Sequence, residues 1–581
     1  MKYLSLIAII FILTPFASAC KDIIVMNDAT AGDYNLFMKV RDPSRQGLQV
    51  LFMVDKGYEY SYHHPWKNFE IPYKIKHKLI GTATLEDIPP SIIKAGILLS
   101  DADIAYGDAD TSTLWINPSK KAWDDFDWLR YSAQNASTED EAVEKLEEVV
   151  KMHAPSVGEN LFIVGKSKAY VVEADAFHFV KEEVEDIAVM SNYPKQLWHS
   201  RWLTRIPIAS SFDRVYEGNV HRWQTIHIGG LYGINILKIG NEWIIVRQVP
   251  LGEKIKVEKG KGAKVGNFYV ELEESNGRTA RIKVCYEYNE WEKKITDMLR
   301  EKYGKITVMD LMNISRIHSE ELEGLRGFCE GEKKATMICK IPCSDGFSGG
   351  WFAPDQCSSI FVPFHTCDKY IYEAYTNGNA AELSLNMLIK FGHGAINFTS
   401  VERVLLKENE KMEKIALKNK NKAEEILTSV DVEMQKQAFM MMKLYINLEG
   451  EERSELKKVW GKDYYETVCN IQRNINKFGE YGKEIIANIA LSICKTRIDV
   501  ESFVNGSNYY TEYSNAENLI KNGDYEEGVK TAKKIFEKTD ESLFGVIHEK
   551  EDNKEKIIVF IGSAIIFMAI IITLLKKPKE K

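Results

Sequence analysis

The sequence has no excess of basic residues and none of the motifs by which proteins bind nucleic acids. It contains 76 Lys and Arg against 84 Asp and Glu, which gives a formal net charge of −8 and a pI near 6.0. No Walker motif, zinc knuckle or helix-turn-helix pattern occurs in it. Because nucleic-acid recognition needs a positive field that gathers phosphates, we expect no nucleic-acid partner.

The usual signatures of metal sites are also absent. No H-E-x-x-H motif occurs, and His63, His64 and His318 have no carboxylates at a ligand spacing. The C-x3-C spacing of Cys339 and Cys343 matches no common zinc pattern. The sequence therefore predicts neither a metal ion nor an organic cofactor.

Residues 1–19 have the features of a secretory signal peptide. Lys2 precedes an apolar stretch over residues 4–13, and Ala17-Ser18-Ala19 is a small-x-small pattern of the kind that signal peptidase cuts. Cleavage there would make Cys20 the first residue of the mature chain and would give it a free α-amine.

Residues 557–575 carry no charge and predict a membrane-spanning helix. A helix of this length rises about 28 Å, close to the roughly 30 Å hydrocarbon core of a bilayer. Lysines crowd residues 576–581, so the positive-inside bias places that tail in the cytoplasm and the preceding chain outside. The charged residues 548–556 are expected to space the folded part from the membrane.

Nine cysteines occur, and five of them lie within residues 329–367. Disulfides persist in exported proteins, so this cluster predicts disulfides that staple a loop-rich region. With Cys20 set apart an even number remains, which permits full pairing without indicating the pairs.

Short β-rich runs predict strands in the region that follows Cys20. Residues 20–41 contain two such runs around a turn, which indicates a hairpin with Cys20 at its outer end. Further strands are expected at residues 50–54, 97–106, 160–164 and 169–173. Because strands often follow one another without a crossover helix, we expect an α+β fold with antiparallel sheets.

Two capping boxes predict helix starts. One covers residues 138–141, ahead of an apolar face that includes Ala142 and Leu146, and the other covers residues 307–310. Beyond residue 380 the sequence is nearly all helical and heavily charged, which is typical of solvated helix faces. We expect residues 401–547 to form a helical C-terminal region.

An N-terminal cysteine would combine a nucleophile and a base in one residue. Its α-amine titrates near 7.7 to 8.0 and its thiol near 8.5, so both are close to working pH. Such a residue needs neighbours that orient the amine, favour the thiolate and donate hydrogen bonds to an oxyanion. FMKVRDPSR, at the second predicted strand, offers Lys39, Arg41 and Asp42 for these tasks.

Cys20 followed by this segment resembles the N-terminal-nucleophile (Ntn) cysteine hydrolases with their [R/K]-N-x-D element. These include choloylglycine hydrolases, penicillin V acylases and, most similar, the dipeptidase A family. The resemblance places Lys39 at the Arg/Lys position and Asp42 at the Asp position, whereas Val40 stands where Asn is usual. Lys39 and Arg41 stay alternatives for the functional cation.

Three later segments extend the resemblance to candidate site residues. AVMSNYPK is similar to the family's T-N-x-P segment and implies Asn192 as an oxyanion or substrate-positioning amide. SSFDR is similar to its S-x-F-x-R element and implies Arg214 as a buried arginine near the cysteine. YGDADT lies where the family has a further polar residue, which here would be Asp108 or Asp110.

Two more segments resemble the dipeptidases in particular. Residues 306–324 are similar to their helix that ends in R-x-H, and residues 348–375 to their W-x-A…P…S-x-x-V-P segment. The matches span residues 20–400, which we expect to be the catalytic domain. The resemblance implies an αββα sandwich and a cysteine hydrolase of linear amide bonds, a dipeptidase that acts on a small peptide or amide; no oligomeric state is indicated.

Other interpretations stay open. Ala17-Ser18-Ala19-Cys20 also loosely resembles a lipobox, so Cys20 could carry a diacylglyceryl group, which would block its α-amine, or it could form a structural disulfide. The same fold could serve an acylase or acyltransferase on non-peptide amides. It could also belong to a lipid-anchored surface binding protein with a degenerate hydrolase fold.

Overall fold

The structure is a computed structural model that describes residues 20–41, 47–87, 94–197, 215–229, 232–330, 334–456 and 458–548. The chain divides into two compact units, Met1–Tyr464 and Tyr465–Lys581. The predicted signal peptide and the predicted membrane-spanning segment lie outside the described residues.

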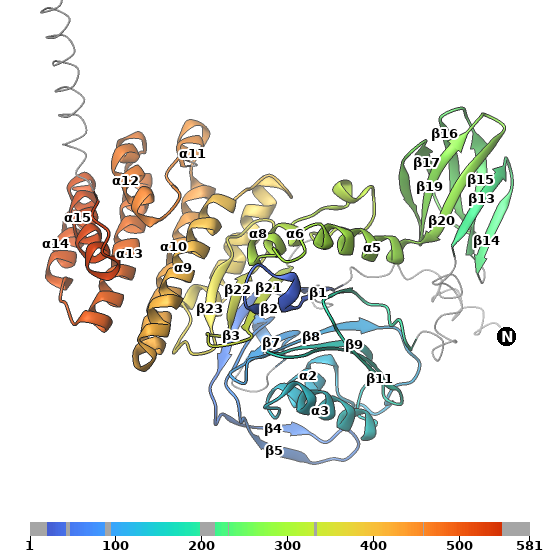
Figure 1. Ribbon diagram of the computed structural model, residues 1–581, viewed down its shortest axis with the longest axis horizontal. Coiled ribbons are helices and arrows are strands. Elements are labelled where there is room, and N and C mark those ends of the chain that lie inside the picture. Colours follow the sequence, from blue (N-terminus) through green and yellow to red (C-terminus); the bar gives the residue numbers. More distant parts are fainter. Residues whose placement is uncertain are drawn as a thin grey trace, which may run out of the picture. The chain divides into compact units, whose positions relative to one another are not determined.

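The first unit contains a six-stranded antiparallel sheet that begins with the predicted hairpin (Figure 1). β1 follows Cys20 directly and pairs with β2 on one side and with β12 on the other, so the prediction of a hairpin is confirmed. In sheet order the strands are β12 (Ile187–Met190), β1 (Lys21–Val25), β2 (Tyr34–Arg41), β21 (Ala335–Pro342), β22 (Gly349–Ala353) and β23 (Val362–His365).

A second, seven-stranded antiparallel sheet faces the first. Its order is β11 (Phe179–Glu183), β10 (Ala169–Ala174), β9 (Gly158–Val164), β8 (Ile104–Thr111), β7 (Ile97–Ser100), β6 (Leu79–Thr84) and β3 (Gln49–Val54). The strand expected at residues 97–106 is instead two antiparallel strands, β7 and β8. They are joined by a turn in which Asp103 has a φ of 60°, a left-handed conformation that Asp tolerates better than most residues.

Helices cover the outer face of each sheet, so the first unit is an αββα sandwich. α2 (Asp125–Ala133) and α3 (Glu139–Lys151) share an apolar core with the seven-stranded sheet. The sheets meet through β1 and β8 and through β2 and β9. On the other side, α5 (Glu287–Arg300) contacts β12, α6 (Val308–Ser315) contacts β2 and β21, and α9 (Thr399–Lys418) and α10 (Ala423–Asn447) contact β23. The prediction of a mixed fold with antiparallel sheets is confirmed.

Both predicted helix starts are present. The Thr138 side chain accepts a hydrogen bond from the Glu141 N–H at the start of α3, although the Glu141 carboxylate accepts from the Ser137 N–H instead of completing the box. At α6 the box is complete, because Thr307 and Asp310 each accept from the other's backbone N–H. These caps satisfy N–H groups that a helix leaves unpaired in its first turn.

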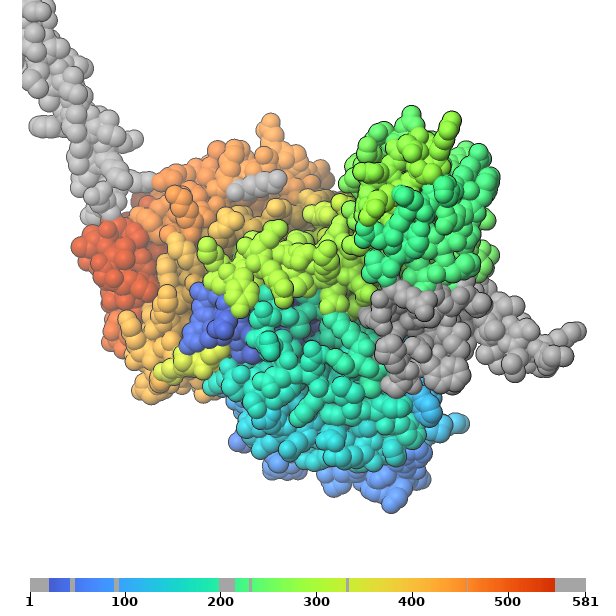
Figure 2. Space-filling model, turned by 45° about the vertical axis from the view of Figure 1, so that its right-hand side comes forward, coloured from blue at the N-terminus to red at the C-terminus, as the bar shows by residue number. Residues whose placement is uncertain are grey.

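Residues 216–286 form a β-structure that the sequence analysis did not predict. Two four-stranded antiparallel sheets enclose an apolar core of their own, and the segment is the green body in Figure 2. One sheet has the order β13 (Tyr216–His221), β20 (Thr279–Tyr286), β19 (Phe268–Ser275) and β18 (Gly262–Val265). The other has β14 (Thr225–Gly229), β15 (Tyr232–Ile239), β16 (Trp243–Val249) and β17 (Lys254–Glu258).

The remaining elements of the first unit are short strands and helices. They are the pair β4 (Glu59–His63) and β5 (Glu70–Lys74), the helices α7 (Glu373–Thr376), α8 (Asn379–Phe391) and α11 (Gly450–Leu456), and the 3-10 turns η1 (Asn27–Ala29), η2 (Leu85–Asp87), η4 (Ser319–Leu322) and η5 (Lys420–Lys422). α12 (Tyr464–Asn474) begins at the last residue of this unit.

The second unit is helical throughout its described part. It contains η6 (Ile475–Lys477), α13 (Glu480–Asn505), α14 (Tyr510–Lys521) and α15 (Tyr525–Phe544). α13 and α14 both contact α15. Over the described ranges of the whole chain, no helix has the length and apolar character needed to span a membrane.

The prediction that disulfides staple residues 329–367 is wrong for this structure. All nine cysteines lie in the described residues, and none of them forms a disulfide. Three strands, β21, β22 and β23, run through this segment and form half of the six-stranded sheet, with loops between them. Cys339, for example, is fully buried within β21, where a ladder of backbone hydrogen bonds holds the strand.

Replacing Thr307 by Ala should loosen the start of α6. Loss of an N-cap costs about 1 kcal/mol, which is about fivefold in the local opening equilibrium. Hydrogen–deuterium exchange in residues 305–316 should accelerate by that factor, whereas Thr307→Ser, which keeps the hydroxyl, should exchange like the unaltered protein. Equal exchange in all three proteins would contradict the capping role.

Candidate active site around Cys20

Cys20 is half-buried at the beginning of β1, in the interior of the six-stranded sheet. Its carbonyl oxygen accepts a hydrogen bond from Ser191 Oγ at 2.5 Å. Ser191 follows the end of β12, and Asp22 on β1 lies opposite Met190 on that strand. β12 and the Ser191 that follows it therefore hold the backbone of Cys20 and β1 in place.

Asn192 lies next to this contact. Its Oδ1 is 3.1 Å from Ser191 Oγ, and its Nδ2 donates to the Asp110 carbonyl oxygen at 2.8 Å. Asn160 holds the surrounding turn, because its Nδ2 donates to the carbonyl oxygens of Ser191 and Tyr193 at 2.7 and 2.9 Å. The side-chain amide predicted to act as a donor is thus linked to the backbone of Cys20 through Ser191.

Lys39 is fully buried and joins the two sheets. It lies opposite Asp22 in the ladder between β1 and β2, and its ammonium group donates to the carbonyl and carboxylate oxygens of Asp108 on β8. Burial alone would lower the pKa of Lys39, but Asp108, Cys20 and Asp22 raise it above its ordinary value. A permanent positive charge therefore faces Cys20.

Arg41 is the second buried cation near Cys20. Its guanidinium donates to Gln49 Oε1 and, at 3.3 Å, to Thr84 Oγ1, and it lies 5.3 Å from the centre of the Phe126 ring. Burial lowers its pKa, while Asp108 and Cys20 act in the opposite direction. Since an arginine keeps its proton in proteins, Arg41 adds a second positive charge to this end of the sandwich.

Asp22 shares the strand face of Cys20, because side chains two apart in a strand point to the same side. It is buried, and within the described residues neither of its carboxyl oxygens has a hydrogen-bond partner. Burial raises the pKa of Asp22 well above its ordinary range, since the opposing effect of Lys39 is smaller and Asp108 adds to the rise. Burial therefore favours the protonated, neutral form of Asp22.

Further carboxyl groups gather beside Asn192. Glu159 on β9 lies opposite Asp110 on β8 and is fully buried. Burial, and after it the negative charges of Asp110 and Asp125, raises the pKa of Glu159 well above its usual value. Burial and the nearby Asp108 and Asp110 raise the pKa of Asp125 in the same way. Burial and neighbouring charges thus favour the protonated forms of Glu159 and Asp125.

The structure brings together Cys20, Lys39 and Asn192, which were predicted from the sequence. The alternative candidates Arg41, Asp108 and Asp110 lie in the same region. Asp42 and Arg214 lie outside the described residues. Sequence reasoning missed Ser191, Asn160, Glu159 and Asp22. Of these, only Asp22 carried a local signal, because it stands two residues after Cys20 and so falls on the same face of a predicted strand.

Two groups of side chains in the described ranges have the spacing of metal ligands. They are His318, Cys329, Cys357 and His393, and His365, Asp368 and Asp431. Neither group contains Cys20, Lys39 or Asn192.

No family model and no curated protein matches the chain. Among solved structures, it is similar to a mutant of conjugated bile acid hydrolase from Clostridium perfringens, with 11% identity, a TM-score of 0.33 and coverage of 60% of this chain and 92% of that one. It is also similar to penicillin V acylase from Agrobacterium tumefaciens, with 15% identity, a TM-score of 0.24 and coverage of 32% and 57%. Similarities this weak do not establish a shared fold, so the αββα assignment rests on the sheets and helices themselves.

Replacing Glu159 by Gln should remove a pH-dependent loss of stability. A Glu in the unfolded chain has a pKa of about 4.3, whereas the pKa of Glu159 in the folded chain is higher. The folded state therefore keeps the proton to a higher pH, and the free energy of unfolding falls as pH rises from the unfolded pKa to the folded one. Denaturant unfolding followed from about pH 4 to pH 8 should show a flatter stability profile and a more stable protein at neutral pH for Glu159→Gln.

Glu183 on the exposed strand β11 provides the matched control. Glu183→Gln should leave the profile unchanged. A Glu159→Gln protein whose stability falls with pH as steeply as that of the unaltered chain would contradict the raised pKa.

Proposed function

We propose that this protein is a cysteine hydrolase of linear amide bonds that uses Cys20 as an N-terminal nucleophile. The observation that carries the proposal is the place of Cys20 at the start of β1, beside the buried charge of Lys39 and the amide of Asn192. The proposal requires cleavage after Ala19, so that the first residue supplies both thiol and α-amine.

The two ionisable groups of Cys20 share one proton in the resting state. The thiol transfers its proton to the α-amine, because both groups titrate close to neutral pH. The positive charge of Lys39 favours the thiolate, since an opposite charge nearby stabilises an anion. The positive charge of Arg41 can also favour the thiolate.

In this proposal Asn192 stabilises the oxyanion that forms during attack. An amide nitrogen carries two N–H groups, and the hydrogen bond to the Asp110 carbonyl uses one of them. The contact with Ser191 holds the Asn192 side chain and so fixes the direction of its second N–H. Donors held in place before the reaction stabilise developing charge without a cost of reorganisation.

The reaction then runs in two steps that balance. The Cys20 sulfur attacks the scissile carbonyl carbon, the carbon–nitrogen bond breaks, and the α-ammonium group gives its proton to the leaving amine. Water next attacks the thioester with the α-amine as base, which releases the carboxylic acid and restores the thiol.

Asp42 and Arg214 keep the roles that the sequence resemblance implies. Asp42 would orient the α-amine, and Arg214 would add positive charge near the thiolate. Both lie outside the described residues, so these two assignments rest on the resemblance of their motifs.

The substrate class and location belong to the same proposal. We propose a dipeptidase, because the segments at residues 306–324 and 348–375 resemble the dipeptidase A family in particular. The apolar residues 557–575 and the lysines after them support an anchor in the cell membrane with the enzyme outside the cytoplasm.

Cys20→Ala should abolish hydrolysis of a dipeptide panel, because the nucleophile is lost. Cys343→Ala is the matched control, since Cys343 is also half-buried and belongs to neither the site nor a metal-ligand group. Both variants should be assayed on dipeptides and on N-acyl amides of similar size. Cys20-dependent turnover of N-acyl amides alone would replace the dipeptidase by an acylase, and full activity of Cys20→Ala would refute the nucleophile.

A chain with one extra Gly ahead of Cys20 separates the thiol from the α-amine. The thiol remains, but the base is displaced by one residue, so turnover should fall to the level of Cys20→Ala. Retained activity in this chain would show that the thiol works without an N-terminal amine.

Asn192→Ala should lower kcat by about 10²- to 10³-fold, the usual loss when an oxyanion donor is removed. KM should change little, because the donor acts mainly on the transition state. Asn68→Ala, at an exposed asparagine, is the control and should leave kcat unchanged. A rise in KM with unchanged kcat would assign Asn192 to substrate binding instead.

A further inference from the structure

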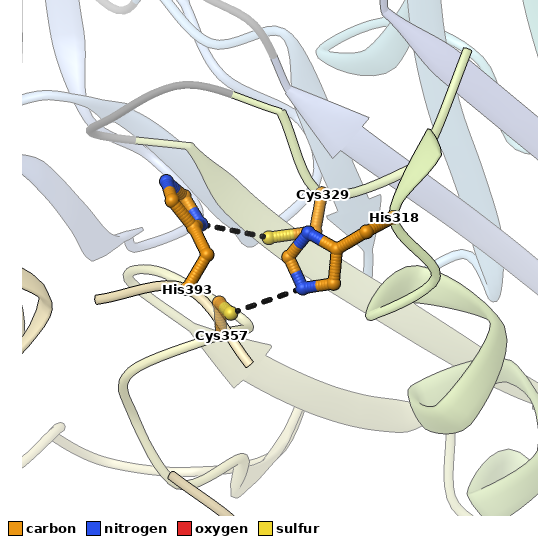
Figure 3. Close-up of side chains that lie close together, drawn as sticks. All are labelled: His318, Cys329, Cys357 and His393. Atoms are coloured by element: carbon orange, nitrogen blue, oxygen red, sulfur yellow. Dashed lines mark hydrogen bonds between the residues drawn. The ribbon is translucent and has the colours of Figure 1, made fainter. Parts of the chain in front are cut away.

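The side chains of four residues from four separate segments meet outside the helices and strands. His318 follows α6, Cys329 lies beyond η4, Cys357 is in the loop between β22 and β23, and His393 follows α8. Figure 3 shows the two imidazoles and the two thiols directed toward one another. The donor atoms of all four lie within 4.8 Å of one another.

The distances within this cluster fit a tetrahedral ion. Cys357 Sγ is 3.5 Å from His318 Nε2, and Cys329 Sγ is 3.7 Å from His393 Nδ1. Zinc binds thiolate sulfur at about 2.3 Å and imidazole nitrogen at about 2.0 Å, so tetrahedral ligands of these two kinds stand about 3.5 Å apart. We propose that these four residues bind one zinc ion as a structural site.

The donor set and its surroundings suit a closed zinc site. Two thiolates balance the double charge of the ion, so the centre is neutral, and both sulfurs are buried, with Cys329 and Cys357 only 3% and 5% exposed. The Gly394 N–H donates to Cys357 Sγ at 3.0 Å, as backbone groups do around ligating atoms. Gly392 and Gly394, on either side of His393, have φ values of 83° and 69°, a left-handed conformation that few other residues adopt.

The second group with ligand spacing is explained by an ion pair instead. His365 Nδ1 is 2.6 Å from an Asp431 oxygen, and His365 Nε2 is 3.2 Å from a Glu413 oxygen. Both ring nitrogens therefore face carboxylates, which fits a protonated imidazole that donates twice. In the first group each imidazole presents one nitrogen to a thiol, as a metal ligand does.

A zinc ion here would fix the chain segment that reaches the candidate active site. Glu330, next to Cys329, accepts from the Gly327 N–H at 2.6 Å and pairs with Lys21 at 3.3 Å, and Lys21 follows Cys20. Arg326 pairs with Glu287 at 2.9 Å and lies over the ring of Tyr288, whose hydroxyl accepts from the Ser191 N–H. The proposed site would thus hold the loop that supports both sides of Cys20.

The test is the zinc content of the full chain, purified without a polyhistidine tag or chelator and measured by elemental mass spectrometry. About one zinc per chain is expected. His393→Asn replaces an exposed side chain, and Cys357→Ser replaces a buried one. Each variant should lose the zinc. Cys343→Ser and His221→Asn, at positions outside the cluster, should retain it.

Cobalt(II) added to the metal-free chain provides a second readout. A thiolate-to-cobalt charge-transfer absorption should appear in the unaltered chain, because the proposed site has two thiolates, whereas the group of His365, Asp368 and Asp431 has none. The absorption should vanish when Cys329 and Cys357 are both replaced by Ser. Any of three results would overturn the proposal. The unaltered chain could bind neither metal, or a double His393→Asn and Cys357→Ser variant could retain zinc. Peptide mapping could also find a disulfide between Cys329 and Cys357.

Discussion

The buried ion pair between Lys39 and Asp108 determines the character of the region around Cys20. It joins the two sheets of the sandwich at the level where β1 begins. Removing one partner of such a pair leaves an uncompensated buried charge and costs about 3–5 kcal/mol. The positive charge is therefore fixed in place by the fold, and Cys20 gains a cation that cannot turn away into solvent.

The protonation of the surrounding acids decides which charge Cys20 experiences. Asp22, Asp125 and Glu159 would make this end of the sandwich strongly negative if all were ionised. Burial raises the pKa of each one, and neighbouring carboxylates add to the rise, so the neutral forms are favoured while Lys39 and Arg41 keep their protons. A thiolate is then favoured in a region that is rich in carboxyl groups.

Local patterns predicted the parts of the fold that depend on neighbouring residues. The hairpin over residues 20–41 and the helices that start after Thr138 and Thr307 have strong signals within a few residues. The Lys39–Asp108 pair joins residues 69 apart and depends on how two sheets stack, which no local pattern contains. The cluster of His318, Cys329, Cys357 and His393 went unpredicted for the same reason, because its ligands come from separate loops and have no motif spacing.

The central claim is that a mature chain begins with Cys20 and an unblocked α-amine beside a buried cation. The most direct measurement is the intact mass and N-terminal sequence of the exported protein. We expect a chain that starts at unmodified Cys20. A chain that keeps residues ahead of Cys20, or carries an acyl group on its α-amine, would contradict it.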